Sequence, residues 1–162
     1  MSASETSCVL CRGAAGDSEL GRVQVWEDRL WRLTTAPEGE LLGFSYLEPK
    51  RHIPHLTDLD GEEARTLGPV LAWVTRMLQQ ATEAELVYVY VFGGGIPHLH
   101  LHLAPHHEGD ALNEQLLRGE VTEVRLPSGA TSIVSKDFPP LPASAHAQVL
   151  ERLKVLLAGS EG

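Results

Sequence analysis

Alternating hydrophobic and polar positions predict most of the strands of this chain. The alternation runs over residues 23–26 and 30–35, on either side of Glu27-Asp28, and predicts a hairpin. The turn signal Pro37-Glu38-Gly39 precedes a third candidate strand over residues 41–47. Later strands are predicted over residues 85–92 and 98–104, and a second hairpin over residues 121–126 and 131–134.

Helical spacing of apolar residues predicts two longer helices. After Asp60, one face collects Leu67, Val70, Leu71, Val74, Met77 and Leu78. Asp60 and Glu63 form a capping-box pattern at the start of this helix, and a last amphipathic helix spans about residues 144–157. We expect Asp110 to cap a short helix that ends near Gly119, and the small polar residues 13–19 to form a flexible link.

The order of these elements (strands, a helix, strands, a helix) predicts an α+β fold. We expect an antiparallel meander sheet with a long helix packed on it and a helix near the C-terminus. The 162 residues fit a single domain, because one hydrophobic core typically serves about 100–200 residues.

Charge and hydropathy narrow the classes of partner. Thirteen Lys and Arg residues against 22 Asp and Glu residues give a net charge of -9, which argues against binding to a nucleic-acid duplex. A phosphorylated small molecule held by a few local donors remains compatible with this charge. The first residues lack the basic start and apolar run of a signal peptide, and no apolar stretch approaches the roughly 20 residues that span a bilayer. We therefore expect a soluble, cytoplasmic protein without a membrane partner.

Three of the eight histidines alternate with leucines in one predicted strand. Because side chains on a strand alternate between its faces, His98, His100 and His102 share one face and the intervening leucines share the other. The leucines are expected to face the core. Three charged imidazoles in a row would repel one another, so at least one should be neutral, and therefore nucleophilic or bound to a metal.

Glycines precede this strand directly. Gly93, Gly94 and Gly95 allow main-chain amides to approach a ligand closely, and phosphate oxygens are natural ligands of such a loop. A phosphate site beside an imidazole indicates phosphoryl or nucleotidyl transfer, in which the middle histidine, His100, attacks phosphorus and a neighbouring histidine hydrogen-bonds the phosphate or the leaving group. A site where three histidines bind a metal and a purely structural role for the histidines are the alternatives.

The two cysteines stand close together as Cys8-Val-Leu-Cys11. A disulfide between them would close too short a loop to constrain the chain much. The spacing is typical of half a zinc site or of a redox pair, and both favour a reducing compartment.

The segment His98-Leu-His100-Leu-His102-Leu-Ala resembles the signature of the histidine triad superfamily, in which three histidines alternate with apolar residues. The resemblance covers about residues 8–110 and includes the Cys-x-x-Cys pair, the Pro-Lys-Arg-His loop at residues 49–52, the long helix and the segment Pro-His-His-Glu-Gly-Asp at residues 105–110. It implies a division into a zinc-binding segment at residues 1–20, a core at residues 21–110 and a C-terminal extension at residues 111–162.

The resemblance also implies an activity. Such proteins hydrolyse or transfer nucleoside monophosphates, often as homodimers, and the middle histidine becomes nucleotidylated. Carried onto this chain, the catalytic residues are His100 and His102, and the substrate is bound by Gly93 to Gly95, His102 and His106. The expected function is nucleotide hydrolysis, as a phosphoramidase or a phosphoanhydride hydrolase. Nucleotidyl transfer to a phosphorylated acceptor and nucleotide binding with little turnover are the alternatives.

Metal binding is implied by the branch of the superfamily that carries Cys-x-x-Cys. There, the remaining zinc ligands match His52 and His98, which gives a set of Cys8, Cys11, His52 and His98. Four protein ligands leave no open position, so this zinc would be structural. His55 is an alternative to His52 that the sequence leaves open.

The chain departs from the superfamily pattern near the expected substrate. The Asp that often follows the second strand is missing, and Glu38 stands nearby in the segment 33–38. Gly95-Ile-Pro replaces the common Gly-Gln-Ser or Gly-Gln-Thr, and His106 replaces the usual Arg after the triad. These changes leave the histidine strand intact and point to a specialised substrate.

Overall fold

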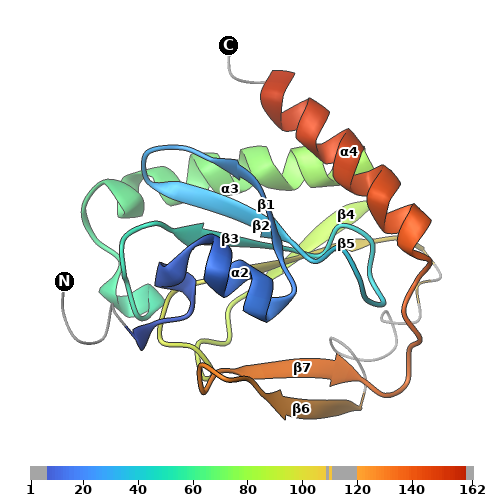
Figure 1. Cartoon of the computed structure of the whole chain (residues 1–162). Coiled ribbons are helices and arrows are strands. Elements are labelled where there is room, and N and C mark those ends of the chain that lie inside the picture. Colours follow the sequence, from blue (N-terminus) through green and yellow to red (C-terminus); the bar gives the residue numbers. More distant parts are fainter. Residues whose placement is uncertain (1–6, 109, 111–119, 160–162) are drawn as a thin grey trace.

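The computed structural model describes residues 7–108, 110 and 120–159. Figure 1 shows a central sheet with helices on both sides of it and a separate hairpin. The helices are η1 (Leu10–Arg12), α2 (Ala14–Leu20), η2 (Leu56–Asp58), α3 (Gly61–Thr82) and α4 (Ala143–Gly159), and the strands are β1 (Val23–Glu27), β2 (Trp31–Thr35), β3 (Ser45–Pro49), β4 (Leu86–Tyr90), β5 (Leu101–His106), β6 (Val121–Arg125) and β7 (Thr131–Ser135).

The central sheet has the order β1-β2-β3-β5-β4, and each neighbouring pair is antiparallel. The prediction of an α+β fold is confirmed, but the strands do not form a simple meander. After β3 the chain crosses through α3 to β4 at the edge of the sheet, and β5 then returns between β4 and β3. The more buried strand, β5, thereby takes an interior place, while β4 has several exposed side chains.

One face of the sheet carries the main hydrophobic core. As the alternation predicts, Leu99, Leu101 and Leu103 are all buried there, at most 3% exposed. They pack in one cluster with Trp31, Leu33 and Leu47 from the sheet, Val74, Met77, Leu78 and Ala81 from α3, and Leu153 and Leu157 from α4. Burial of an aliphatic side chain of this size contributes about 1.5–3 kcal/mol, so this cluster stabilises the fold on the side of α3.

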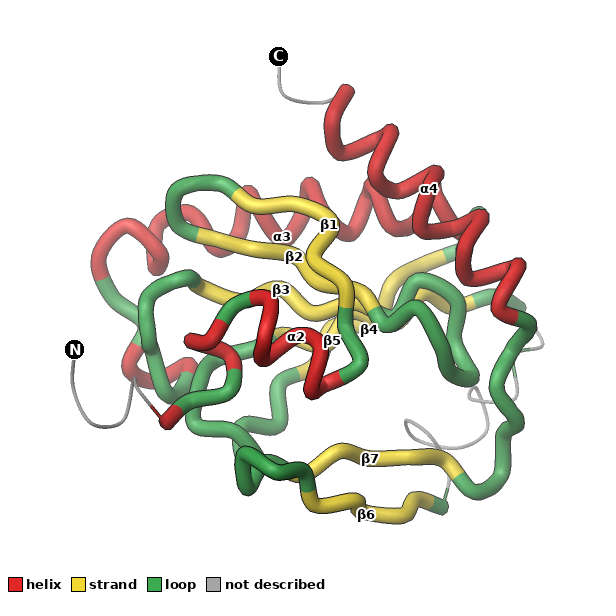
Figure 2. Tube along the Cα trace, in the orientation of Figure 1, coloured by secondary structure: helices red, strands yellow, loops and turns green. Residues whose placement is uncertain are grey.

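The opposite face carries the histidines and is covered in part by α2 (Figures 1 and 2). This helix corrects the expectation of a flexible link at residues 13–19. Gly16 lies so close to the Val9 carbonyl that a Cβ atom would be 1.9 Å from its oxygen, and Asp17 forms an ion pair with Arg32 on β2. Gly21, with φ at +64°, ends the helix in the left-handed conformation. Tertiary contacts, rather than the weak local pattern, therefore fix this segment.

Other boundaries differ from the prediction. The third strand begins at Ser45 instead of residue 41, and β5 begins at Leu101, so His98 and His100 precede the strand. The Leu99 amide donates to the carbonyl of Ile53 in the central loop instead of to a neighbouring strand. At the start of α3, Asp60 occupies the N-cap position without capping, because its carboxylate accepts from Arg51.

The C-terminal part forms a second, two-stranded sheet from β6 and β7, as predicted, followed by α4. Near the turn of this hairpin, Leu126 and Ala130 pack with Ile96 and with the segment Cys8, Val9 and Leu10 in a small apolar cluster. The backbone amide of Ser128 donates to Glu19 on α2. The short helix predicted after Asp110 lies outside the described residues. None of the helices described is both long and apolar enough to cross a membrane.

Candidate functional site

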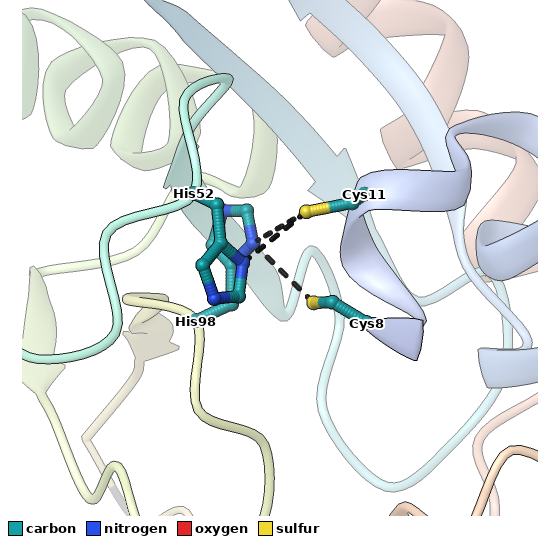
Figure 3. A group of neighbouring side chains, drawn as sticks. All are labelled: Cys8, Cys11, His52 and His98. Atoms are coloured by element: carbon teal, nitrogen blue, oxygen red, sulfur yellow. Dashed lines mark hydrogen bonds between the residues drawn. The ribbon is translucent and has the colours of Figure 1, made fainter. Parts of the chain in front are cut away.

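Two cysteines and two histidines lie close together next to the segment that leads into β5. Cys8 and Cys11 flank the start of η1, His52 comes from the loop after β3, and His98 comes from the segment before β5 (Figure 3). One potential ligand atom from each residue lies within 4.8 Å of all the others. Segments far apart in sequence thus converge on one point.

The spacing of these atoms fits a tetrahedral zinc ion. Nδ1 of His98 lies 3.5 Å from Sγ of Cys8 and 3.4 Å from Sγ of Cys11, and Nδ1 of His52 lies 3.3 Å from Sγ of Cys11. Zn–S bonds of about 2.3 Å and Zn–N bonds of about 2.0–2.1 Å imply S–N edges of about 3.5 Å in a tetrahedron. The donor set therefore matches a closed, structural zinc site in both chemistry and size.

Further contacts set the protonation of His98 and Cys8 to the forms that bind a metal. The Nε2 atom of His98 is 2.8 Å from the carbonyl oxygen of Pro49, so this nitrogen carries the proton and Nδ1 is left as the ligand atom. Burial raises the pKa of the Cys8 thiol, but the contacts with His98 and the backbone hydrogen bonds at Cys11 and Leu10 together outweigh it, so the pKa lies below its usual value. The thiolate is the form that binds a metal.

The two histidines of the loop after β3 occupy different positions. His52 joins the four-residue cluster, whereas His55 is the N-cap residue of η2, where its side chain and that of Asp58 form a capping box. The capping box predicted at Asp60 is not formed, and the preceding short helix η2 has one instead.

The orientation of His100 follows from its neighbour. Its Nδ1 atom is 2.6 Å from the carbonyl oxygen of His98, so Nδ1–H donates and Nε2 keeps its lone pair. Among the described residues, Nε2 has no hydrogen-bond partner. His100 is 7% exposed, and burial lowers its pKa despite the hydrogen bond to His98, with the positive charge of Arg22 acting in the same direction. A neutral imidazole with a free Nε2 can act as a nucleophile.

His102 lies among aromatic rings. Its ring stacks on Tyr90 with the centroids 5.0 Å apart, and Tyr46, Phe92 and Phe44 lie within 6.0 Å of it. The His100 ring is 5.1 Å away. The register explains this surrounding, because Tyr46 on β3 and Tyr90 on β4 both pair directly with His102.

The glycine loop lies uncovered, and His106 lies apart. A Cβ atom at Gly94 or Gly95 would meet no atom within 4 Å, so packing does not demand glycine there, and Gly93 has φ at +69°. His106 comes four residues after His102 on β5, about 13 Å along a strand at 3.3 Å per residue. Its ring contacts Tyr88. The structure thus brings His98, His100 and His102 together but places His106 at the far end of the strand.

A buried ionic cluster lies beside the triad, and no sequence pattern predicts it. Arg32 donates to Asp17 at 2.7 Å and to Glu48 at 2.8 Å, and Arg22 donates to the other oxygen of Glu48 at 2.6 Å. The four side chains are at most 7% exposed. In the sequence these residues are scattered charges in ordinary strand and helix positions, so only the fold reveals the cluster.

No family model matches this chain, and no curated protein matches it either. Solved structures do. A zinc-bound histidine triad family protein from Mycobacterium smegmatis is similar over 96% of both chains, with 20% identity and a TM-score of 0.63. A histidine triad protein from Bradyrhizobium japonicum covers 85% of this chain with 91% of its own, at 17% identity and a TM-score of 0.65.

The chain has the histidine triad fold. A third similar structure is a hypothetical histidine triad nucleotide-binding protein from Sulfolobus tokodaii, with 19% identity, a TM-score of 0.64 and coverage of 94% of this chain and 93% of that one. Within this histidine triad fold, His98 of the four-residue donor set and the buried His100 lie two residues apart on the same segment. The similarity to the protein from Mycobacterium smegmatis extends over the C-terminal extension as well as the core, because it includes nearly the whole chain.

Proposed function

We propose that this protein is a nucleotide hydrolase that releases a nucleoside monophosphate through a nucleotidyl-His100 intermediate. The observation that carries the proposal is the hydrogen bond from Nδ1 of His100 to the His98 carbonyl, which leaves Nε2 as a free nucleophile. The nucleotide-binding protein from Sulfolobus tokodaii, which shares the fold, supports a nucleotide as the ligand.

The reaction has two displacements at phosphorus. Nε2 of His100 attacks the α-phosphorus, an N–P bond forms, and the bond to the leaving amine or phosphate breaks with its electron pair on the leaving group. His102, whose ring centroid lies 5.1 Å from that of His100, would donate a hydrogen bond to the phosphate or the leaving group. Water then breaks the N–P bond, which regenerates His100 and releases the nucleoside monophosphate. The amides of Gly93, Gly94 and Gly95 would bind the phosphate oxygens.

Zinc has a structural role in this proposal. Cys8, Cys11, His52 and His98 would hold it, and with four protein ligands it supplies tertiary cross-linking and no open coordination position. The carbonyl that orients His100 belongs to His98 itself. Cysteines kept as thiolates also support a reducing compartment such as the cytoplasm.

The test is turnover of an adenosine phosphoramidate, a guanosine phosphoramidate, a dinucleoside polyphosphate and ADP-glucose, with intact-protein mass spectrometry of the quenched reactions. The parent should release a nucleoside monophosphate and carry a nucleotidyl adduct, and His100→Ala should lose both. His107→Ala is the matched control, because its ring bonds the Thr82 carbonyl outside the triad, and it should keep the activity.

The outcomes separate the alternatives. An adduct that is discharged only by a phosphorylated acceptor would indicate a nucleotidyltransferase. Nucleotide binding without an adduct or release would leave a binding module, and adducts that persist in His100→Ala would contradict the proposed nucleophile.

We also propose a homodimer through β4. This strand lies at the edge of the sheet, where backbone amides and carbonyls are available for pairing, and Leu86, Tyr88 and Val89 are 41–51% exposed. Analytical ultracentrifugation should find a dimer for the parent and a monomer for Val89→Lys. A monomeric parent would contradict this assembly.

A further inference from the structure

A phosphate bound at His100 needs positive charge close to it, and the two basic residues after β3, Lys50 and Arg51, are both engaged in ion pairs. Lys50 pairs with Glu27 at 2.9 Å, and Arg51 bonds both Glu63 and Asp60 at the start of α3. His106 lies about 13 Å along β5 from His102. Arg22, in the link between α2 and β1, is different because it lies on the histidine face of the sheet.

Strand register places the two β3 residues that contact Arg22 near the triad. Tyr46 pairs with His102, and Glu48 lies two residues further along β3, past the pairing of Leu47 with Leu101 at the start of β5. Arg22 contacts both of these β3 residues: its guanidinium carbon is 3.5 Å from the centre of the Tyr46 ring, and its Nη1 donates to Glu48. The guanidinium therefore lies over β3, on the face of the sheet that carries His102.

The guanidinium is held in place and retains unused donors. Glu48 and the Tyr46 ring fix its position, and its side chain is 7% exposed. An arginine side chain has five N–H donors, and the hydrogen bond to Glu48 is the only one that the Arg22 guanidinium makes among the described residues. A rigid guanidinium with free N–H groups matches the geometry of phosphate oxygens.

Arg22 is not the only cation that pairs with Glu48. Arg32 donates from Nε to the other oxygen of Glu48 and also pairs with Asp17. The two carboxylates and two guanidiniums of this cluster balance in charge, and Glu48 stays paired with Arg32 when Arg22 turns part of its donor set to an incoming anion. The cluster thus presents one cation to the triad without leaving a buried carboxylate alone.

We propose that Arg22 is a phosphate-binding residue of this site, in which it hydrogen-bonds the nonbridging oxygens of the phosphate that His100 attacks. The inference rests on the proposed function. It assigns to the link between α2 and β1 a direct role at the substrate.

The test measures binding rather than turnover. Inorganic phosphate is titrated into the zinc-loaded protein and followed by ³¹P NMR, for the parent, Arg22→Gln, Arg22→Lys and Arg32→Gln, with the melting temperature of each recorded. Since a hydrogen bond to a charged group is worth about 1.5–3 kcal/mol, Arg22→Gln should weaken phosphate binding about 10-fold or more. Arg22→Lys keeps the charge without the planar fork and should bind with an intermediate affinity.

Arg32→Gln is the matched control, because it disrupts the same cluster from a strand farther from the triad. It should lower the melting temperature and weaken phosphate binding less than Arg22→Gln does, because the Arg22 guanidinium stays in place although it is then the only guanidinium of the cluster left to pair with Glu48. Equal weakening by Arg32→Gln and Arg22→Gln, or parent-like binding by Arg22→Gln, would overturn the inference and leave the proposed nucleophile untouched. A parent that binds no phosphate would overturn it as well, while the His100 adduct decides the proposed function separately.

Discussion

The two faces of the central sheet are held by different forces. On the face toward α3, Leu101 and Leu103 pack among apolar side chains from five elements. On the other face, His98 and His100 are just as well buried, at 2% and 7% exposed, but their neighbours are thiols, carbonyls and charged or aromatic groups. Apolar packing is tolerant of small shifts, whereas ligand spacing and hydrogen bonds fix atoms within a few tenths of an ångström. The histidine face, whose groups are held by directional contacts, is therefore the face suited to a catalytic site.

The largest effect should come from the donor set. The double variant Cys8→Ser, Cys11→Ser should lose the approximately one zinc per chain that a four-ligand site binds. It should also lose much of its stability, since structural zinc contributes on the order of 10 kcal/mol in small zinc-dependent folds. Metal analysis and thermal unfolding measure both consequences. His55→Ala, outside the donor set, should keep its zinc. Parent-like zinc content in the double variant would refute the site.

The leucine face offers the next effect. Leu103 is fully buried, so Leu103→Ala should reduce the free energy of unfolding by about 2–5 kcal/mol while the zinc content stays unchanged. Chemical denaturation measures the loss. Val155→Ala on α4, where the side chain is 72% exposed, should change stability by less than about 0.5 kcal/mol. A Leu103→Ala variant that loses zinc would show that the two faces are not independent.

A smaller effect should follow from the ionic cluster. Asp17→Asn keeps the shape of the side chain but removes the charge that Arg32 faces, so stability should fall by about 1.5–3 kcal/mol. Glu83→Gln provides a comparison, because the Glu83–Arg152 pair is more than half exposed and should contribute no more than about 1 kcal/mol. Similar losses in the two variants would argue against a special role for burial of the cluster.

Sequence patterns predicted the leucine face better than the histidine face. The period of two placed the leucines on the core side and the histidines opposite, and helical spacing located α3 and α4 within a few residues. These features are local and repeat along the chain. The strand order was missed, because the insertion of β5 between β3 and β4 depends on a crossover that no local pattern encodes.

The histidine face could be predicted only where a motif existed. Cys8, Cys11, His52 and His98 follow from the superfamily resemblance, and the structure brings them together. Helix α2 was missed because Asp17 becomes favourable there only once Arg32 lies opposite it. Arg22 was also missed, because the β3 residues that it contacts lie near the triad only through the pairing of β3 with β5.

The claim that the two faces are held differently can be tested by hydrogen–deuterium exchange of the zinc-loaded protein, with and without a strong chelator. Chelation should increase exchange at residues 8–20 and in the segment His98 to His100, while the amides of α3 between Val74 and Leu78 keep their protection. Equal deprotection of α3, or unchanged protection around Cys8 and His98, would contradict the account.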